Sequence, residues 1–372
     1  MILNQHLLVK TTDIAPVKML TPSTALRRAI LPQCTRAACV AVVSHPSRGH
    51  SSSGWKRTRT CRRHEQLSLA VSAVATEIAE VQEKFGITDH VEITEGKNGL
   101  PMVVLRHSCG SKAEIYLYGA VVTSWTQPSG DEVLYVRPDA KFDKSKPISG
   151  GIPHCFPQFG PGPAMQQHGF ARNLDWTVSA TSADLQPDER DPSVELTLTD
   201  NDYTRKMWPH AFKAVYTVTL HEEQLRTDLR IINTGDAPFD FTAALHTYIE
   251  VLDIEVAKVR GLQGLKYLDK VANPEEPATK EEDRELVTFS GPVDSVYLKA
   301  KDYVELDVGT GAAVAISSSG WEDVVVWSPW TAMEDCYKKF CCVENAKFNS
   351  PATVQPGESW RATQDFAVID LE

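Results

Sequence analysis

Apolar and polar residues alternate along much of the chain with the two-residue period of a β-strand. In LRTDLRII (225–232) every second position is apolar or Thr, and arginines and an aspartate fill the positions between, as in a strand with one buried and one wet face. The following INTGDAPFDF (232–241) predicts strand, turn and strand, because Asn-Thr-Gly-Asp sustains neither element. Further strands are expected in MVVLRH (102–107), EIYLYGA (114–120), VELTLT (194–199), AVYTVTLH (214–221) and AVAISS (313–318).

Helical periodicity is confined to TEIAEVQEKFG (76–86), where a helix is expected. Many short strands and few helices predict an all-β protein, a large antiparallel β-sandwich. The 372 residues suit one large domain of this kind, which we place at residues 76–372.

The first 75 residues differ from the rest in composition. They hold 11 lysines and arginines against two acidic residues, and they are rich in Ser, Thr and Ala. This composition is typical of an organelle transit peptide, so residues 1–75 are expected to be a disordered address segment for the chloroplast stroma, with the mitochondrion as the less favoured destination. The alternative is a disordered basic tail that binds an acidic partner.

The remainder is acidic enough to bring the whole chain to a net charge of −11. Nucleic acid and anionic membranes require a basic face, so neither is expected as a partner, and no apolar run is long enough to predict membrane insertion. The eight cysteines show neither zinc-site spacing nor the density of a disulfide scaffold. No metal is expected.

One stretch, SGGIPHCFPQFGPGPAMQQHGFARNLDW (149–176), combines five Gly and four Pro with several polar side chains. Gly and Pro in this density predict a rigid irregular loop, and such loops often bind ligands. The polar groups suit a ligand rich in hydroxyls, or an anion.

Three other segments carry candidate chemistry. TAALHTYIEV (242–251) places His246 in an apolar strand, FCCVENAK (340–347) places Glu344 at the end of one, and VVVWSPW (324–330) ends a strand with two tryptophans. Each has an ordinary explanation: a core histidine, a strand meeting water, aromatic packing. Together a His and a Glu can divide acid and base roles near neutral pH, and aromatic rings can floor a sugar site.

These segments, with KPISGGIPHCFPQFG (146–160) and QQHGFARN (166–173), resemble the aldose 1-epimerase superfamily, and within it the glucose-6-phosphate 1-epimerases of plants and green algae. The resemblance covers most of residues 88–372. It implies a galactose-mutarotase-like β-sandwich, no organic cofactor, and interconversion of the α and β anomers of an aldohexose 6-phosphate. A sugar phosphate is the expected partner, and a monomer is expected.

The resemblance also implies residue roles. His246 is the expected acid and Glu344 the expected base. The expected substrate-binding residues are Ser149, Gln167, His168, Arg172 and Asp269. One position departs from the family pattern: Ser149 stands where typical members carry an arginine that holds the phosphate. Lys144 or Lys146 are alternatives for that contact.

Because of Ser149, two alternatives stay open. One is a non-catalytic carbohydrate-binding or assembly module on the same fold, and the other is a mutarotase for unphosphorylated sugars.

Overall fold

A computed structural model describes residues 75–162, 165–183, 191–300 and 302–371. Residues 75–85 are helical, which confirms the helix expected at 76–86. The expected transit peptide lies outside the described residues except for Ala75, and it stays a prediction. All named strands fall between Val91 and Asp370, within the region expected to form the domain.

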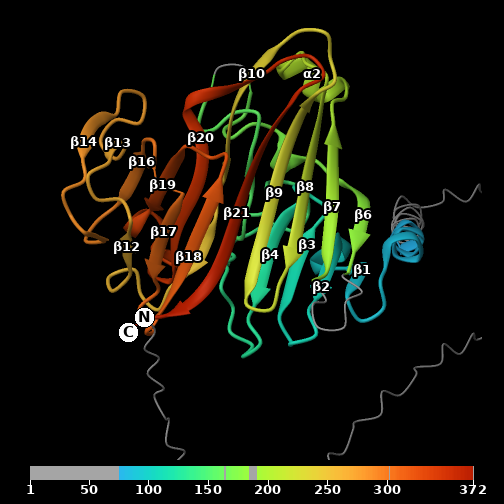
Figure 1. Ribbon diagram of the computed structural model, residues 1–372, viewed down its shortest axis with the longest axis horizontal. Coiled ribbons are helices and arrows are strands. Elements are labelled where there is room, and N and C mark those ends of the chain that lie inside the picture. Colours follow the sequence, from blue (N-terminus) through green and yellow to red (C-terminus); the bar gives the residue numbers. More distant parts are fainter. Residues whose placement is uncertain (1–74, 163–164, 184–190, 301, 372) are drawn as a thin grey trace, which may run out of the picture. The chain divides into compact units, whose positions relative to one another are not determined.

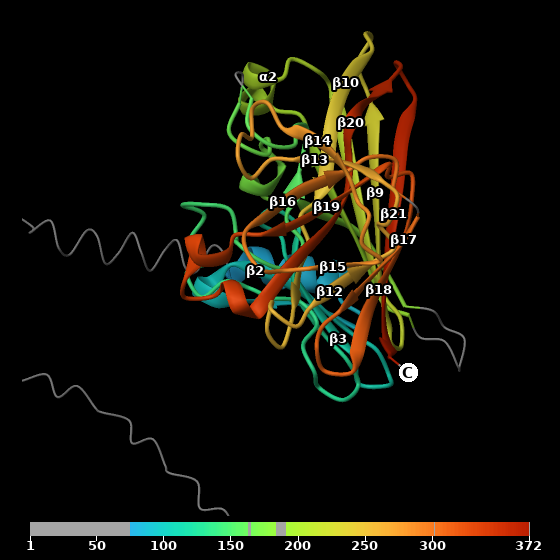
Figure 2. The same ribbon diagram turned by 90° about the vertical axis from the view of Figure 1, so that its left-hand side faces the viewer.

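The alternating pattern forms antiparallel strands in two large sheets and one small one, layered as Figures 1 and 2 show. The nine-stranded sheet contains, in spatial order, β15 (Leu286–Thr288), β12 (Lys258–Arg260), β17 (Tyr303–Asp307), β18 (Ala312–Ser319), β21 (Ser359–Asp370), β9 (Gln224–Asn233), β8 (Phe212–Leu220), β7 (Ser193–Thr199) and β6 (Thr177–Ser182).

The eight-stranded sheet carries the residues of interest for function. Its order is β14 (Ala278–Glu281), β13 (Lys266–Asp269), β16 (Val293–Tyr297), β19 (Asp323–Ser328), β20 (Phe340–Val354), β10 (Phe239–Leu245) and β5 (His154–Cys155), with β11 (Tyr248–Glu250) also paired to β20. The four-stranded sheet is β1 (Val91–Glu95), β2 (Pro101–Arg106), β3 (Lys112–Tyr116) and β4 (Val121–Thr126).

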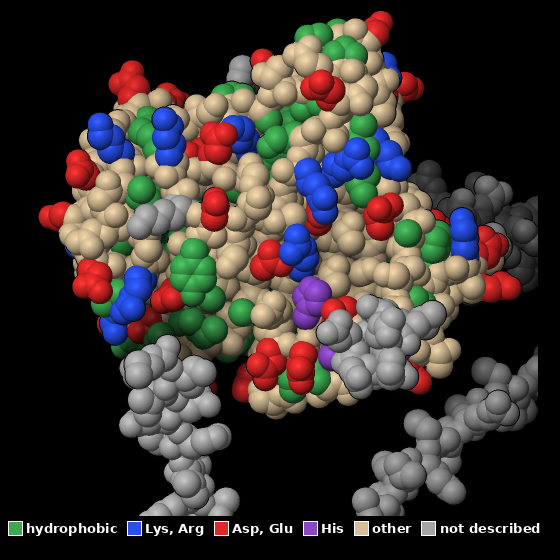
Figure 3. All heavy atoms as spheres, in the orientation of Figure 1, with side chains coloured by type: hydrophobic (Ala, Val, Ile, Leu, Met, Phe, Trp, Pro, Cys, Tyr) green, Lys and Arg blue, Asp and Glu red, His purple; other side chains and the backbone are tan. Residues whose placement is uncertain are grey.

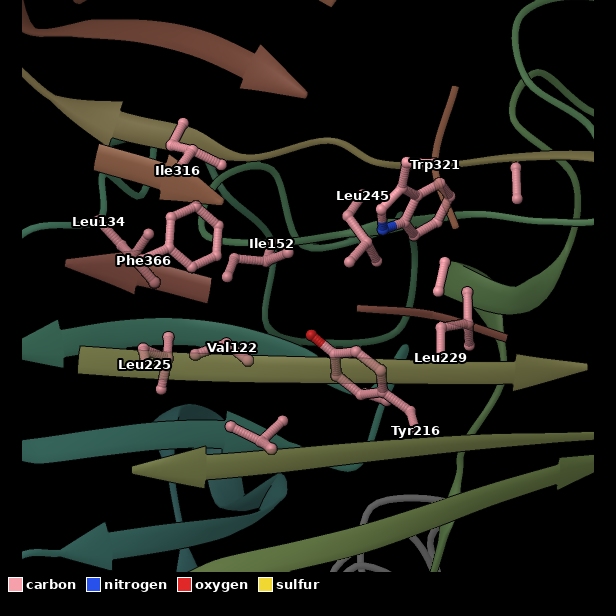
Figure 4. Close-up of a cluster of buried hydrophobic side chains, with 14 of the residues drawn as sticks. Val122, Leu134, Ile152, Tyr216, Leu225, Leu229, Leu245, Ile316, Trp321 and Phe366 are labelled. Atoms are coloured by element: carbon pink, nitrogen blue, oxygen red, sulfur yellow. The ribbon is translucent and has the colours of Figure 1, made fainter. Parts of the chain in front are cut away.

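Strand β9 shows why the sheets pack as layers. Its residues Leu225, Leu229 and Ile231 are buried, and the arginines and aspartate between them face outward. Figure 4 shows Leu225 and Leu229 in the core with Tyr216 of β8, Phe366 of β21 and Leu245 of β10. Figure 3 shows acidic and basic side chains interspersed on the molecular face drawn. The antiparallel β-sandwich is confirmed.

Short helical turns complete the fold: α2 (Asp202–Met207), η1 (Lys97–Gly99), η2 (Ala171–Asn173), η3 (Trp330–Met333) and η4 (Tyr337–Lys339). The sequence pattern missed α2 because it is only six residues long. Its start is fixed by Asn201, whose side chain accepts hydrogen bonds from the backbone N–H groups of Tyr203 and Thr204.

Three expected strands differ from the sequence prediction by more than one or two residues at an end. The strand expected at 114–120 ends at Tyr116. The strand expected at 242–251 is interrupted, since His246 and Thr247 separate β10 from β11. Glu344 lies inside the long strand β20 rather than at a strand end, and its side chain is buried rather than meeting water. Among the residues described, no helix has the length and apolar character needed to cross a membrane.

Candidate active site

Strand register brings His246 and Glu344 together although 97 residues separate them in the chain. On one side of the break in the ladder Leu245 lies opposite Asn345, and on the other Tyr248 lies opposite Cys342. Counting inward from both pairs puts His246 opposite Glu344. Directly opposed residues of an antiparallel pair share a face of the sheet, so both side chains point the same way.

The two functional groups are in contact and shielded from water. Nδ1 of His246 lies 3.3 Å from Oε1 of Glu344, and their side chains are 11% and 2% exposed. Within the described residues neither His246 Nδ1 nor Glu344 Oε2 has a hydrogen-bond partner. Buried polar atoms in native proteins are usually paired, so these atoms are available to a bound molecule.

The same face of the eight-stranded sheet continues across β20, β19 and β16. Tyr248 is opposite Cys342, Cys342 is opposite Trp327, and Trp327 is opposite Asp294. The backbone N–H of Lys270 bonds to the carbonyl of Asp294, and the Lys270 Nζ lies 3.9 Å from an Asp294 carboxylate oxygen. We call this row, together with His246 and Glu344, the site face.

Aromatic rings form the floor around His246. The Tyr248 ring stacks on the imidazole with centroids 4.8 Å apart, and the Trp327 ring meets it edge-on at 5.6 Å. Apolar ring faces next to a polar pair suit a pyranose, which presents C–H groups on its faces and hydroxyls at its rim.

The glycine-rich loop can approach the sheet closely because it lacks side chains at two positions. Gly150 and Gly151 have φ of +123° and +67°, and a Cβ at either would lie within 2.4 Å of the Val136 or Val122 backbone. Backbone bonds from Tyr248 N–H to the Gly151 carbonyl and from His246 N–H to the Pro153 carbonyl then fix the loop against the histidine. Among the described residues of 149–176 the backbone is irregular apart from β5 and η2, as expected; the rigidity of the loop stays a prediction.

The second half of this loop brings three expected binding residues to the site. Nδ1 of His168 accepts from the Gly160 backbone N–H, and its Nε2 lies 3.2 Å from Nε2 of the Gln167 amide. The His168 and His246 rings meet edge-on at 5.7 Å. Arg172 donates through Nη2 to the Gln167 carbonyl, while its Nε is buried with no partner among the residues described.

Burial pushes both members of the pair toward their neutral forms. Loss of hydration raises the pKa of Glu344 well above 4.5; nearby Asp294 raises it further, and Lys270 and Arg172 oppose the increase. Burial also lowers the pKa of His246 well below 6.5, aided by His168 and Arg172. Burial, with Arg172 and Lys270, lowers the pKa of His168 to about 3.

Two of the expected binding residues, Asp269 and Ser149, have their described contacts away from the pair. Asp269 lies opposite Ser295, one position out of step with Leu268 and Val296, whose row leads to Glu344. Its carboxylate therefore points to the other face, where Lys280 donates to it. The Ser149 carbonyl accepts from the backbone N–H of Arg137. The binding roles of both residues stay predictions.

Sequence reasoning missed Lys270, Asp294 and Tyr248. Lys270 directly follows Asp269. The sequence motif therefore singled out the neighbour of the residue whose side chain lies on the site face. Tyr248 stands two residues after His246, the spacing at which side chains share a face, and that signal could have found it. Asp294 lies in a strand with no motif, and only the sheet register places it at the site.

Metal ligands are absent from the described part of the chain: it holds no group of three or more His, Cys, Asp or Glu side chains positioned for a metal ion. Within the described residues, the site face and the loop beside it offer one imidazole–carboxylate pair, a second histidine and two cationic side chains. Such a set can move protons and bind an anionic, hydroxylated ligand.

The model of the family described as "Aldose 1-epimerase" matches residues 101–367. The chain belongs to the aldose 1-epimerase family, a family of sugar isomerases.

Two relatives bear the name "putative glucose-6-phosphate 1-epimerase". The one from Cenchrus ciliaris is 38% identical over 283 residues, covering 73% of this chain and 85% of the relative. The one from Escherichia coli K12 is 35% identical over 263 residues, covering 66% and 83%.

Solved structures of similar proteins have the same fold. A "putative mutarotase" from Salmonella typhimurium superposes with a TM-score of 0.68 at 28% identity, covering 77% of this chain and 96% of that one. A galactose mutarotase-like protein from Clostridium acetobutylicum gives 0.63 at 17% identity, covering 76% and 98%. The expected galactose-mutarotase-like fold is confirmed.

Proposed function

We propose that this protein is a glucose-6-phosphate 1-epimerase, which interconverts the α and β anomers of an aldohexose 6-phosphate. The observation that carries the proposal is the cross-strand pair: a buried imidazole 3.3 Å from a buried carboxyl group, beside two cationic side chains. The names of the relatives add support for the phosphorylated substrate.

Mutarotation requires one base and one acid. The Glu344 carboxylate removes the proton from the C1 hydroxyl while the His246 imidazolium donates a proton to the ring oxygen, and the C1–O5 bond breaks. Rotation about C1–C2 in the open-chain aldehyde presents the other face of the carbonyl. The proton transfers then reverse, with His246 taking back its proton and Glu344 returning one to O1, and the opposite anomer forms.

The pair reaches this charged form by moving one proton. Burial favours a neutral Glu344 and a neutral His246, which together hold one dissociable proton. The carboxylate–imidazolium form holds the same number, so moving one proton from Glu344 to His246 connects the two. A bound phosphate dianion offsets the charge of Arg172 and Lys270, which lowers both pKa values, so phosphate binding raises the pKa of Glu344 and of His246 together.

Anomer exchange measured by NMR tests the proposal directly. Wild-type protein is expected to accelerate exchange of glucose 6-phosphate over the spontaneous rate. A Glu344→Gln variant keeps the shape of the side chain but removes the base, so kcat should fall by about 10²–10⁴-fold. Its unfolding temperature should not fall, because the substitution also removes a carboxyl group that is costly to ionise in a buried site.

Three outcomes would contradict parts of the proposal. Wild-type activity in a folded Glu344→Gln variant removes Glu344 from the mechanism. Equal kcat/KM for glucose and glucose 6-phosphate identifies a mutarotase for free sugars. Sugar binding by wild-type protein without acceleration of either sugar identifies a non-catalytic binding module.

A further inference from the structure

Arg137 lies at the margin of the site face on a segment that extends the eight-stranded sheet beyond β11. The Tyr135 N–H bonds to the Tyr248 carbonyl, and the Gly151 N–H bonds to the Tyr135 carbonyl. Tyr135 packs in the same apolar cluster as Tyr248 and Phe340, with its ring stacked on that of Phe340. Arg137 is two residues further along this extended segment, so its side chain emerges on the same face as that of Tyr135.

The pKa shifts of neighbouring groups agree with this placement of Arg137. Burial raises the pKa of Tyr248, and the guanidinium groups of Arg137 and Arg172 both act against that increase. Burial raises the pKa of Cys342, the cross-strand neighbour of Tyr248, and the charge of Arg137 acts against that increase. Two arginines from separate segments are therefore close enough to act on one hydroxyl, on a ring that stacks against the catalytic histidine.

Ser149 leaves space in front of Arg137. Val136 pairs with Gly150, and the Arg137 N–H bonds to the Ser149 carbonyl, so Arg137 and Ser149 are opposed across two antiparallel segments. Opposed residues have Cβ atoms about 4.5–5.5 Å apart, which is less than the length of an arginine side chain. The short serine and the adjacent glycine do not block the guanidinium.

Arg137 also has free hydrogen-bonding capacity. Its Nε and Nη2 donate to the two carboxylate oxygens of Asp139, at 2.9 Å and 2.7 Å. A guanidinium carries five N–H donors in a planar fork, so three remain for a second anion. The Asp139 side chain is 62% exposed, and its contact holds the fork in place from the solvent side.

We infer that Arg137 is a ligand of the substrate's phosphate, acting with Arg172, and that it supplies across the strand pair the charge that Ser149 lacks. The inference rests on the proposed function for the identity of the anion. Of the lysines considered from the sequence, Lys144 pairs with Asp175 at 2.7 Å, and Lys146 is exposed.

The test compares kcat/KM for glucose 6-phosphate with kcat/KM for glucose in the NMR anomer-exchange assay. The ratio should fall at least about tenfold in Arg137→Ala, because a charge-assisted contact to phosphate is lost, and by a smaller factor in Arg137→Lys. The double variant Arg137→Ser with Ser149→Arg places the guanidinium on the opposite segment and should recover most of what Arg137→Ser alone loses.

Arg361→Ala is the matched control. Arg361 is also an arginine paired with an aspartate, Asp228, but it lies in β21 of the other large sheet, and its removal should leave the ratio unchanged. A ratio within about twofold of wild type in Arg137→Ala, or no recovery in the double variant, overturns the inference.

A direct binding measurement separates this inference from the proposed function. If wild-type protein accelerates neither sugar, the proposed function fails, and ³¹P NMR titration with glucose 6-phosphate and with inorganic phosphate decides the role of Arg137. At least about tenfold weaker binding of glucose 6-phosphate by Arg137→Ala supports a phosphate ligand, and equal affinity overturns it.

Discussion

Two buried histidines lie next to each other on opposite faces of the eight-stranded sheet. His154 of β5 is opposite Leu245 of β10, and its ring packs on Trp176 and Tyr216 at 5.0 Å and 4.3 Å. His246 follows Leu245 directly and faces Glu344 instead. The first ring is part of the packing between the large sheets, and the second belongs to the site face.

Burial alone does not distinguish the two. It lowers the pKa of His154 to about 3 and that of His246 well below 6.5, so both favour the neutral imidazole. What differs is the residue opposite each histidine: an aliphatic side chain for His154 and an ionisable carboxyl group for His246. A depressed histidine pKa therefore indicates a candidate acid or base only when a proton-exchanging partner shares its face.

Substitutions at the adjacent residues 245 and 246 should separate stability from chemistry. Leu245→Ala opens a cavity in the core between the sheets and should reduce the free energy of unfolding by about 2–5 kcal/mol. His246→Asn removes the acid and should lower kcat for anomer exchange by about 10²–10⁴-fold while the unfolding midpoint in urea stays close to wild type.

The comparison of the two histidines is contradicted if Leu245→Ala affects the chemistry and His246→Asn affects the stability. A His246→Asn protein that loses its cooperative unfolding transition would assign His246 to the core. A folded Leu245→Ala protein with a strongly reduced kcat would mean that the core face also positions the reacting groups.

The fold could be predicted from the sequence because the alternation of apolar and polar residues is a local pattern. Residues 225–232 reveal both faces of β9 without reference to any other strand, and an irregular loop follows from Gly and Pro density alone. The pairing of His246 with Glu344 is different: it depends on the register of β20 against β10 and β11, which two-residue periodicity leaves undetermined. The resemblance to a family supplied the pair, and the register explains it.

The same reason accounts for what the sequence did not reveal. Asp294 and Arg137 stand in segments without a recognisable motif, and their relation to the site arises only when strands distant in the chain are placed side by side. Lys270 shows how sharp this dependence is, because one step past Asp269, the last residue of β13, exchanges one face of the sheet for the other.

The pH dependence of stability should distinguish the two faces again, with a smaller effect. Unfolded histidines bind protons below pH 6.5, whereas His154 in the folded protein binds one only near pH 3, so stability should fall as the pH decreases from 7 to 5. Glu344 acts with the opposite sign: its folded-state pKa is raised above 4.5, so stability is lost as the pH rises above that value.

Urea unfolding of two variants between pH 5 and 7 measures both contributions. His154→Phe keeps an aromatic ring but removes the titration, so stability should depend less on pH, by up to about 1.4 kcal/mol per pH unit. Glu344→Gln should make stability rise more steeply with pH. Identical slopes in both variants and wild type would contradict the inferred neutral forms.

The smallest effects are expected from Asp294 and Asp269, on strands β16 and β13 toward one edge of the eight-stranded sheet. The charge of Asp294 raises the pKa of Glu344 from the site face. Because Glu344 carries the dissociable proton of the neutral pair, its ionisation sets the alkaline limb of the kcat profile. Asp294→Asn should shift that limb to lower pH and change the rate at neutral pH by less than about tenfold.

Asp269→Asn is the comparison on the opposite face. Asp269 accepts from Lys280 and is not among the groups that shift Glu344, so the register predicts an unchanged alkaline limb and an unchanged KM for glucose 6-phosphate. The family resemblance predicts instead that this variant raises KM, because it assigns Asp269 to the substrate. Measuring KM for both aspartate variants decides which argument holds. A raised KM with Asp269→Asn would require the end of β13 to turn its other face toward the sugar when substrate binds.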